Sequence, residues 1–397
     1  MGAPRYFVWD FHTTVEVGSG CRTFVCQRFM ELGCRRVALL TDQGLVKAGI
    51  VEQIESIFQV QGGPALAGIY DKIEQDAASG AVNDCARWYR EIAADGILAV
   101  GGGSVLDTAK GVKAMLGMQV TDVKEIILGN MGLYLKPLGK PLGVPHVAIP
   151  TTAGTGSEVS PIAVIYNEMM KIKADLIHPY LPADVALLDP DLTVGLSPKM
   201  TAHTGFDALC HAVEGLSSPG ANCMIDSLAL QAIRLIAKNL PLAVADGANL
   251  EARTKMLVAS NMSIMSFAMS GLFYPVHNIA HAVGAQMRIP HGETNAVLLP
   301  VVMEKLPRHY LPKAEELARA FDVHIKGMAP EEALKAAVEA VRSLQRECGV
   351  EPVFSSKVRK NVLGSLYWSV KIDPAGMLYP LPEDVIKNIL ANCFEIE

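Results

Sequence analysis

The chain has 397 residues, of which 50% are hydrophobic and 19% charged, and its formal net charge is −6. This length exceeds the usual size of one hydrophobic core, so two domains are expected. The negative charge and the lack of a Lys/Arg run argue against nucleic acid or an anionic membrane as a partner. No stretch approaches the roughly eighteen uninterrupted apolar residues of a transmembrane helix.

The first half alternates short apolar runs with helical stretches. Residues 35–42 predict a buried strand that ends at Asp42, followed by a helix through residues 43–58. Residues 95–104 predict a strand that runs into glycines and then a helix over 105–116. Residues 145–157 repeat the pattern of a strand followed by small polar residues. This alternation predicts a mostly parallel, doubly wound sheet.

The second half changes to helical periodicity. Residues 223–240, 330–348 and 382–394 carry apolar side chains at helical spacing, and strand signals are few after about residue 190. The proline-containing stretch 181–203 is the expected boundary between an α/β domain and an all-helical one.

The cysteines and the first residues of the chain indicate the cellular compartment of the protein. Eight cysteines occur without a C-x-x-C pair, which is far below the density of a disulfide scaffold. The opening MGAPRYFVWDFHTT has no basic segment followed by an apolar run, so no signal peptide is expected. Reduced thiols and a cytoplasmic location are therefore predicted.

Two features of the first half of the sequence are suited to binding a nucleotide. Gly101, Gly102, Gly103 and Ser104 stand where a predicted strand feeds a helix, and such a turn offers free N–H groups and a partial positive charge to a phosphate. A tight structural turn is the alternative, because the sequence is not G-x-G-x-x-G. Asp42, at another strand end, would accept hydrogen bonds from ribose hydroxyls and favour NAD(H) over NADP(H). Asp42 is equally suited to capping the next helix, and the two roles can coexist.

A hydroxyl-rich loop follows the third predicted strand. It contains Thr151, Thr152, Thr155 and Ser157 with glycines between them. Such loops are often only connections, but this one follows a strand in the same half as the glycine turn. It is the expected second wall of a nucleotide site.

Histidines gather in the second half, where three of the chain's ten lie between residues 276 and 292. Asp207 and His211 share one helix face at i, i+4, and so do His277 and His281. An Asp–His hydrogen bond would satisfy the first pair alone. With His291, however, the group offers a carboxylate and several imidazoles, which suits Fe²⁺ or Zn²⁺. The spacing leaves open which histidine is not a ligand.

With these motifs in view, the chain resembles the iron-containing (group III) alcohol dehydrogenases over nearly its whole length. The resemblance rests on GGGSVLDTAK, PTTAGTGSEVS, DPDLT, TGFDALCHAVEG and HNIAHAVGAQMRIPHG. It implies a Rossmann-like dinucleotide-binding domain over residues 1–190 and an all-helical metal- and substrate-binding domain over 191–397. A homodimer or a larger homo-oligomer is expected, because closed homo-oligomers, and dimers above all, are the commonest assemblies.

The resemblance also implies roles for individual residues. The metal ligands would be Asp207, His211, His277 and His291, and His281 would relay protons as the catalytic residue. The cofactor site would contain Asp42, Gly101, Gly102, Gly103, Ser104, Thr151, Thr152, Thr155, Ser157 and Lys173. A solvent-facing Lys173 is the alternative for the last of these, and Asp107 and Lys110 are expected to have mainly structural roles.

The expected reaction is hydride transfer between NAD(H) and a small primary alcohol or aldehyde, in the direction of aldehyde reduction, with Fe²⁺ or alternatively Zn²⁺. A zinc glycerol dehydrogenase-like enzyme, a dehydroquinate synthase-like lyase and a non-catalytic NAD or metal sensor are the alternatives. Arg288 departs from the family motif. We expect it to face solvent or pair with an acid; the alternative is that it favours an anionic aldehyde such as sulfoacetaldehyde.

Overall fold

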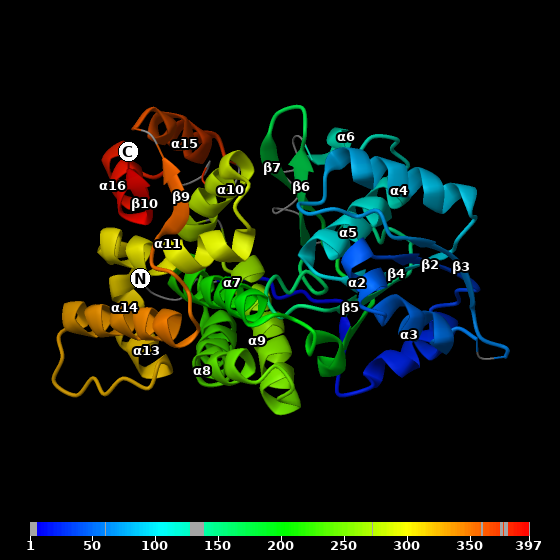
Figure 1. Cartoon of the computed structure of the whole chain (residues 1–397), viewed down its shortest axis with the longest axis horizontal. Helices are drawn as coiled ribbons and strands as arrows, with labels where there is room; N and C mark the ends of the chain where they lie inside the picture. Colours follow the sequence, from blue (N-terminus) through cyan, green and yellow to red (C-terminus); the bar gives the residue numbers. More distant parts are fainter. Residues whose placement is uncertain are drawn as a thin grey trace. The chain divides into compact units, whose positions relative to one another are not determined.

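The computed structural model describes residues 6–59, 61–127, 139–271, 273–358, 360–373, 376 and 380–396. The chain divides into two compact units (Figure 1). The sheet unit comprises Val8–Thr152 and Gly156–Gly195. The helical unit is built mainly from Leu196–Glu397 and includes the short segment Ala153–Thr155.

The sheet unit is organised by a six-stranded sheet in the order β1-β8-β5-β4-β2-β3. Every pair of neighbouring strands is parallel. The strands are β1 (Thr14–Val17), β2 (Arg36–Leu40), β3 (Ala65–Tyr70), β4 (Gly96–Gly101), β5 (His146–Pro150) and β8 (Val185–Leu188). From β2 the chain passes to β3 on one side and then to β4 on the other. In such sheets ligands bind at the carboxyl ends of the strands where the order reverses.

Helices cover both faces of this sheet, as the alternation along β2 shows. Val37 and Leu39 belong to the core under α1 (Val25–Glu31) and α3 (Ile50–Ile57). Ala38 and Leu40 belong to the core under α4 (Ser79–Glu91) and α5 (Gly103–Gly117). Central parallel strands are buried on both faces, which explains their unbroken apolar sequence. The smaller elements are η1 (Cys21–Phe24), α2 (Gln43–Lys47), α6 (Lys124–Ile127), η3 (Pro190–Thr193) and the antiparallel hairpin of β6 (Ile162–Asn167) and β7 (Ile172–Ile177).

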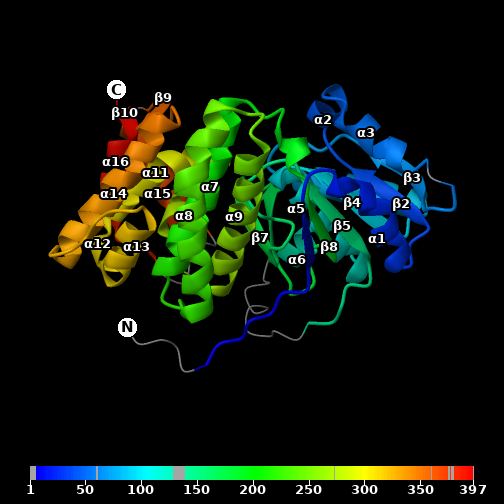
Figure 2. The same cartoon turned by 90° about the horizontal axis from the view of Figure 1, so that it is seen from below.

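The helical unit is centred on α7 (Pro198–Ser217), which packs against α8 (Cys223–Ala245), α9 (Leu250–Met269) and α11 (His291–Lys305) (Figure 2). Sixteen of the twenty residues of α7 are buried. The other helices are α10 (Pro275–Met287), α12 (Pro307–Tyr310), η4 (Leu311–Lys313), α13 (Ala314–Ala320), α14 (Pro330–Glu347), α15 (Lys360–Ile372) and α16 (Glu383–Cys393). A short parallel pair, β9 (Phe354–Val358) and β10 (Phe394–Ile396), also belongs to this unit.

The fold class is therefore confirmed, with two differences in detail. The C-terminal region is mostly helical, but β9 and β10 interrupt the predicted all-helical character. The helix predicted over residues 43–58 is two helices, α2 and α3, because Gly49 between them has a φ of 73°. That left-handed conformation suits glycine and ends the first helix.

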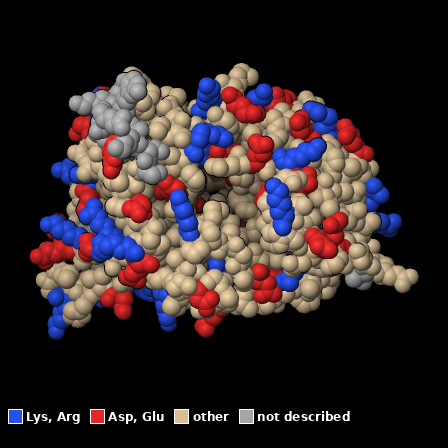
Figure 3. Space-filling view, viewed as in Figure 1, with Lys and Arg blue, Asp and Glu red and all other residues tan. Residues whose placement is uncertain are grey.

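Helix α8 is long and apolar enough, by length and composition alone, to cross a membrane. Ile225, Ile233, Ile236 and Leu240 of this helix are fully buried in the core of the helical unit. These residues lie on the face of α8 that packs against the rest of the helical unit. On the face seen in Figure 3, positive and negative side chains are interspersed, as expected for a surface without a single-sign field.

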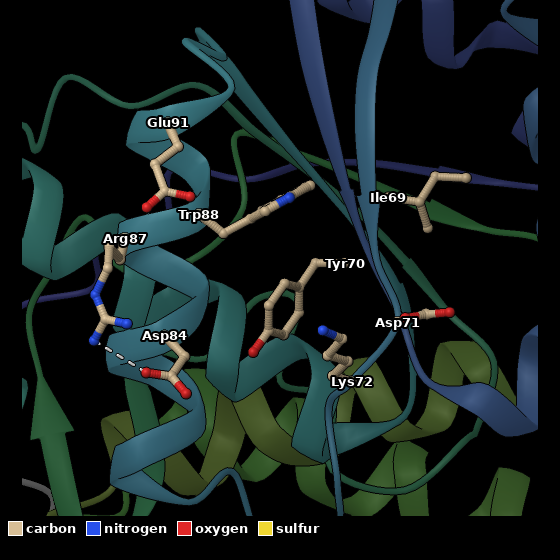
Figure 4. Close-up of a pocket in the computed structure, with 8 residues that line it drawn as sticks. All are labelled: Ile69, Tyr70, Asp71, Lys72, Asp84, Arg87, Trp88 and Glu91. Carbon is tan, nitrogen blue, oxygen red and sulfur yellow. Dashed lines mark ion pairs between the residues drawn. The ribbon is translucent and has the colours of Figure 1, made fainter.

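One surface pocket, of about 300 Å³, lies at the edge strand β3 beside α4 (Figure 4). Its lining consists of Ile69, Tyr70, Asp71, Lys72, Asp84, Arg87, Trp88 and Glu91. The rings of Tyr70 and Trp88 are 5.4 Å apart, and Arg87 pairs with Asp84 at 3.1 Å. This pocket contains none of the predicted cofactor residues.

Candidate metal centre and cofactor site

Three helices of the helical unit supply the predicted metal ligands. Asp207 and His211 lie on one face of α7, and His277 lies in the first turn of α10. Helix α10 ends at Met287, the next residue, Arg288, has a left-handed φ of 56°, and Pro290 immediately precedes α11. This break makes His291 the first residue of α11 and turns it back toward α7.

The ligand atoms of these residues converge. Asp207, His211 and His277 each offer one ligand atom, and the three atoms lie within 4.8 Å of one another. Oδ1 of Asp207 is 3.7 Å from Nε2 of His277 and 3.4 Å from Nε2 of His291. The four residues predicted as ligands are thus brought together, with a spacing that a single cation could bridge.

Asn295 and Glu214 also belong to this cluster, although neither was predicted. Nδ2 of Asn295 donates to Oδ1 of Asp207 at 2.6 Å and lies 3.3 Å from Nε2 of His277 and 3.2 Å from Nε2 of His291. Oε2 of Glu214 lies 2.5 Å from Nδ1 of His277. Both residues are fully buried. The available signal was helical spacing, since Asn295 follows His291 by four residues and Glu214 follows His211 by three.

Burial and neighbouring charges shift the pKa values in the cluster in opposite directions. Burial lowers the pKa of His211 to about 3, against the attraction of Asp207. Burial also acts to lower the pKa of His277, but its bonds with Asp207 and Glu214 outweigh it and raise the pKa to about 9. Burial would raise the pKa of Asp207, yet the surrounding imidazoles hold it well below its usual range. The cluster therefore presents an ionised carboxylate among imidazoles.

His281 stands one helical turn beyond His277 on α10. Its ring centroid is 5.3 Å from that of His291 and 6.1 Å from that of His277. Its Nδ1 is 3.7 Å from Oδ1 of Asp373, a buried carboxylate that follows α15. His281 therefore lies beside the predicted metal ligands and close to a carboxylate, that of Asp373, outside the ligand set.

The donor set fits a divalent metal ion. Nδ1 of His277 faces a carboxylate oxygen and so carries a proton. Nε2, the atom that faces Asp207, is the ring nitrogen that would give up its own proton and offer its lone pair to a metal ion. Burial lowers the pKa of His211 to about 3, so its imidazole is neutral and one of its ring nitrogens carries a lone pair. Buried nitrogen lone pairs beside an ionised carboxylate are the chemistry that Fe²⁺ and Zn²⁺ accept.

Most of the predicted cofactor residues of the sheet unit lie at the carboxyl ends of three adjacent strands; Ser157 and Lys173 do not. Asp42 follows β2, the glycine turn follows β4, and Thr151 and Thr152 follow β5. Oδ1 of Asp42 accepts a hydrogen bond from the backbone N–H of Leu45 at 3.0 Å, so Asp42 does cap α2. The place where the strand order reverses, between β2 and β4, is thus bordered by Asp42 and by the glycines.

The glycine turn is close-packed against its own helix. A Cβ added at Gly101 would lie 2.5 Å from Cγ2 of Val105, so glycine is required there. Gly102 is the residue before the first turn of α5, which Gly103 begins, and no described side chain caps this turn. The hydroxyl of Ser104 accepts a hydrogen bond from the backbone N–H of Asp76 at 3.0 Å.

The other predicted cofactor residues have partners within the chain. Nζ of Lys173 pairs with Asp76 at 2.9 Å, and both side chains are buried, so Lys173 does not face solvent. The hydroxyl of Ser157 donates to Asp107 at 2.5 Å. Asp107 also accepts from the backbone N–H of Val164, which ties α5 to β6. Thr155 is grouped with the helical unit, whereas Thr151, Thr152 and Ser157 are grouped with the sheet unit.

Comparison with known proteins identifies the family. Residues 12–190 match the family model described as iron-containing alcohol dehydrogenase, and residues 201–360 match the model of the C-terminal part of the Fe-containing alcohol dehydrogenase family. These matches cover more than half of the chain. The chain belongs to the iron-containing alcohol dehydrogenase family.

Individual relatives are similar to this protein over most of the chain. It is 30% identical over 394 residues to choline dehydrogenase of Bacillus subtilis (strain 168), covering 99% of this chain and 96% of that protein. It is 35% identical over 341 residues to lactaldehyde reductase of Escherichia coli (strain K12), covering 85% and 86%. A crystal structure of 1,3-propanediol oxidoreductase superposes with a TM-score of 0.88 at 32% identity, covering 98% of this chain and all of that one. The chain is an NAD-dependent alcohol dehydrogenase, which interconverts an alcohol and its carbonyl compound.

Proposed function

We propose that this enzyme reduces a small aldehyde with NADH at a metal centre held by Asp207, His211, His277 and His291. The observation that carries the proposal is the convergence of these four side chains from α7, α10 and α11. A family described as iron-containing supports the presence of a metal, and Fe²⁺ is the proposed ion, with Zn²⁺ as the alternative.

The cofactor is proposed to bind at the carboxyl ends of β2, β4 and β5. The uncapped first turn of α5 would receive the pyrophosphate, because free N–H groups and the helix dipole favour an anion there. Asp42 would accept hydrogen bonds from the ribose hydroxyls and repel a 2′-phosphate. Thr151, Thr152, Thr155, Ser157 and Lys173 are retained as cofactor-site residues, with Ser157 and Lys173 acting through the groups that they bind, Asp107 and Asp76.

The helical unit is proposed to manage charge and protons during hydride transfer. A divalent cation, when bound, polarises a carbonyl oxygen for hydride attack or lowers the pKa of an alcohol. The four ligands would fix its place, and three of them, Asp207, His211 and His277, are buried. His281, beside the ligands, would exchange a proton at its imidazole with the substrate oxygen, and Asp373 would orient its ring.

Arg288 bears on the choice of substrate. It is exposed at the C-terminal end of α10, in a left-handed conformation, which favours the expectation that it does not contact the substrate. We therefore propose a neutral small aldehyde such as lactaldehyde, a hydroxyaldehyde or propanal. Replacing Arg288 with Ala is expected to change KM for neutral and anionic aldehydes equally. A selective rise in KM for sulfoacetaldehyde would instead support the anionic substrate.

The cell compartment and assembly state are further proposals. All eight cysteines are free thiols, which supports a reducing compartment such as the cytoplasm. A homodimer or a larger homo-oligomer is proposed, as the commonest closed assembly. Neither nucleic acid nor a membrane is proposed as a partner.

The proposed function is tested by NADH oxidation with a panel of neutral, carboxylate-bearing and sulfonate-bearing aldehydes. The enzyme is compared before chelation, after chelation and after anaerobic reconstitution with Fe²⁺ or Zn²⁺. We expect turnover to be lost on chelation and restored by metal, while NADH binding persists throughout. Undiminished turnover in the metal-free protein would refute the metal centre, and absence of turnover with every aldehyde would favour a sensor.

A further inference from the structure

Glu214 is a carboxylate buried completely inside the helical unit. It lies on α7, one turn beyond His211, and has no exposed surface. A buried carboxylate is strongly unfavourable unless each oxygen is bonded. Both oxygens have partners in the first turn of α10: Oε1 accepts from the backbone N–H of Val276 at 2.6 Å, and Oε2 lies 2.5 Å from Nδ1 of His277.

The first of these contacts holds the start of α10. That helix begins at Pro275, which has no N–H, and no described side chain from its own N-terminal residue caps it. The N–H groups of a first helical turn lack partners within the helix and carry partial positive charge. Glu214 supplies an acceptor from α7 for the N–H of Val276. The backbone that carries His277 is thus fixed by a carboxylate on the helix that carries Asp207 and His211.

The second contact decides which nitrogen of His277 bears the proton. Oε2 of Glu214 lies 2.5 Å from Nδ1 of His277, and because a carboxylate oxygen is an acceptor, the N–H at Nδ1 donates to Glu214. Nε2 is then the nitrogen left to bind a metal ion, and it is the atom that faces Oδ1 of Asp207 at 3.7 Å and Nδ2 of Asn295 at 3.3 Å. A carboxylate behind an imidazole in this way fixes the ring orientation and raises its basicity as a ligand.

From these two contacts we infer that Glu214 is a positioning residue of the metal centre, which holds His277 in the orientation and tautomer that bind the ion. The inference rests on the proposed function, because it requires that His277 is a metal ligand. It adds to that proposal a residue that does not itself need to touch the ion. It also assigns α7 three roles in one centre: two ligands and the support of a third.

Glu214→Gln tests the inference with little change in volume. Gln has one oxygen and one NH₂ group, so it can accept from Val276 or from His277 but not from both. If the oxygen stays with Val276, the NH₂ group faces Nδ1 and favours the tautomer with the proton on Nε2. We expect the Kd for Co²⁺, measured by competition with a chromophoric chelator, to rise about 10- to 100-fold. The visible absorption of the cobalt-loaded protein is expected to change as well, while NADH binding stays within about twofold.

Asn239→Asp is the matched control. Asn239 is a buried residue of α8 whose amide donates to the carbonyl of Leu235 at 2.7 Å, so this variant exchanges amide and acid in the same unit on a helix that carries none of the proposed ligands. It is expected to leave the cobalt spectrum and affinity unchanged, whatever it does to stability. Equal weakening of metal binding in both variants would reduce Glu214 to a structural residue and overturn the inference.

The remaining outcomes are also decisive. Wild-type affinity and spectrum in Glu214→Gln would overturn the positioning role while leaving the metal centre intact. Failure of the wild-type protein itself to bind Co²⁺ or Zn²⁺ would refute the metal centre, and the inference with it. If Glu214→Gln does not fold, NMR of the ¹⁵N-histidine-labelled, Zn²⁺-loaded wild-type protein shows which nitrogen of His277 carries the proton. A proton on Nδ1 of His277 is expected, and a proton on Nε2 would overturn the inference.

Discussion

Asp42 has two roles in this account, and two substitutions separate them. Its Oδ1 caps α2 through the N–H of Leu45, and the carboxylate is proposed to bind the ribose of NAD(H). Asp42→Asn retains an acceptor for the cap but removes the charge. Asp42→Ala removes both. Hydrogen bonds to charged groups contribute about 1.5–3 kcal/mol, so kcat/KM for NADH is expected to fall about 10- to 150-fold in both variants.

Stability should distinguish the two variants. Loss of a helix cap costs about 1 kcal/mol, which lowers Tm by roughly 2–4 °C in a unit of this size. That drop is expected for Asp42→Ala and should be largely absent for Asp42→Asn. Thermal unfolding and initial rates with NADH and NADPH measure these effects, and Asp42→Asn should also raise the preference for NADPH. Unchanged kinetics with NADH in both variants, with only the Ala variant less stable, would show that Asp42 is a cap and nothing more.

Three further predictions concern the glycine turn, the proton relay and a buried histidine. Gly101→Ala should lower the free energy of unfolding by about 1–3 kcal/mol, because its Cβ would lie 2.5 Å from Val105. Gly102→Ala is the control in denaturant titrations, because its Cβ would be 3.4 Å from the nearest neighbour. Equal losses of unfolding free energy in the two variants would contradict the packing argument. His281→Ala should lower kcat about 100-fold or more with metal content unchanged by elemental analysis, whereas loss of the metal would make His281 a ligand. His146 is fully buried, neither ring nitrogen has a partner among the described residues, and burial holds its pKa well below the usual value. The unfolded chain therefore binds a proton at this site below pH 6.5 that the folded chain does not, so stability falls as the pH drops. Replacing His146 with Leu should remove about 1 kcal/mol of the stability loss between pH 7.5 and 5.5 in urea titrations, and an unchanged loss would argue against a neutral buried imidazole.

Local sequence patterns predicted those parts of the structure that depend on neighbours in the chain. The strand ending at Asp42 and the strand running into Gly101 were found because parallel strands buried on both faces have continuous apolar sequence. The i, i+4 pair of Asp207 and His211 follows directly from helical geometry. The sequence does not predict the helix break at Gly49, because a glycine inside a stretch of helical periodicity does not by itself indicate a left-handed φ.

The unpredicted residues of the site depend on contacts distant in sequence. Glu214 reads as an ordinary acidic residue of a helix until its partner His277, 63 positions later, is placed beside it. Asp373 follows α15 without any motif, and only the packed structure brings it to His281. The sequence allows Lys173 to face solvent equally well, and its burial depends on Asp76, on the loop that follows β3. The partners of these residues are determined by long-range packing and not by local sequence propensity.

The central claim is that one divalent ion, held by Asp207, His211, His277 and His291, is required for aldehyde reduction. Anaerobic titration of Fe²⁺ into the metal-free enzyme, with NADH-dependent turnover followed at each addition, tests it most directly. Turnover is predicted to rise in proportion to added metal, to level off at about one ion per chain, and to stay near zero in His277→Ala. Turnover that is independent of added metal, or a His277→Ala variant with the wild-type response, would contradict the account.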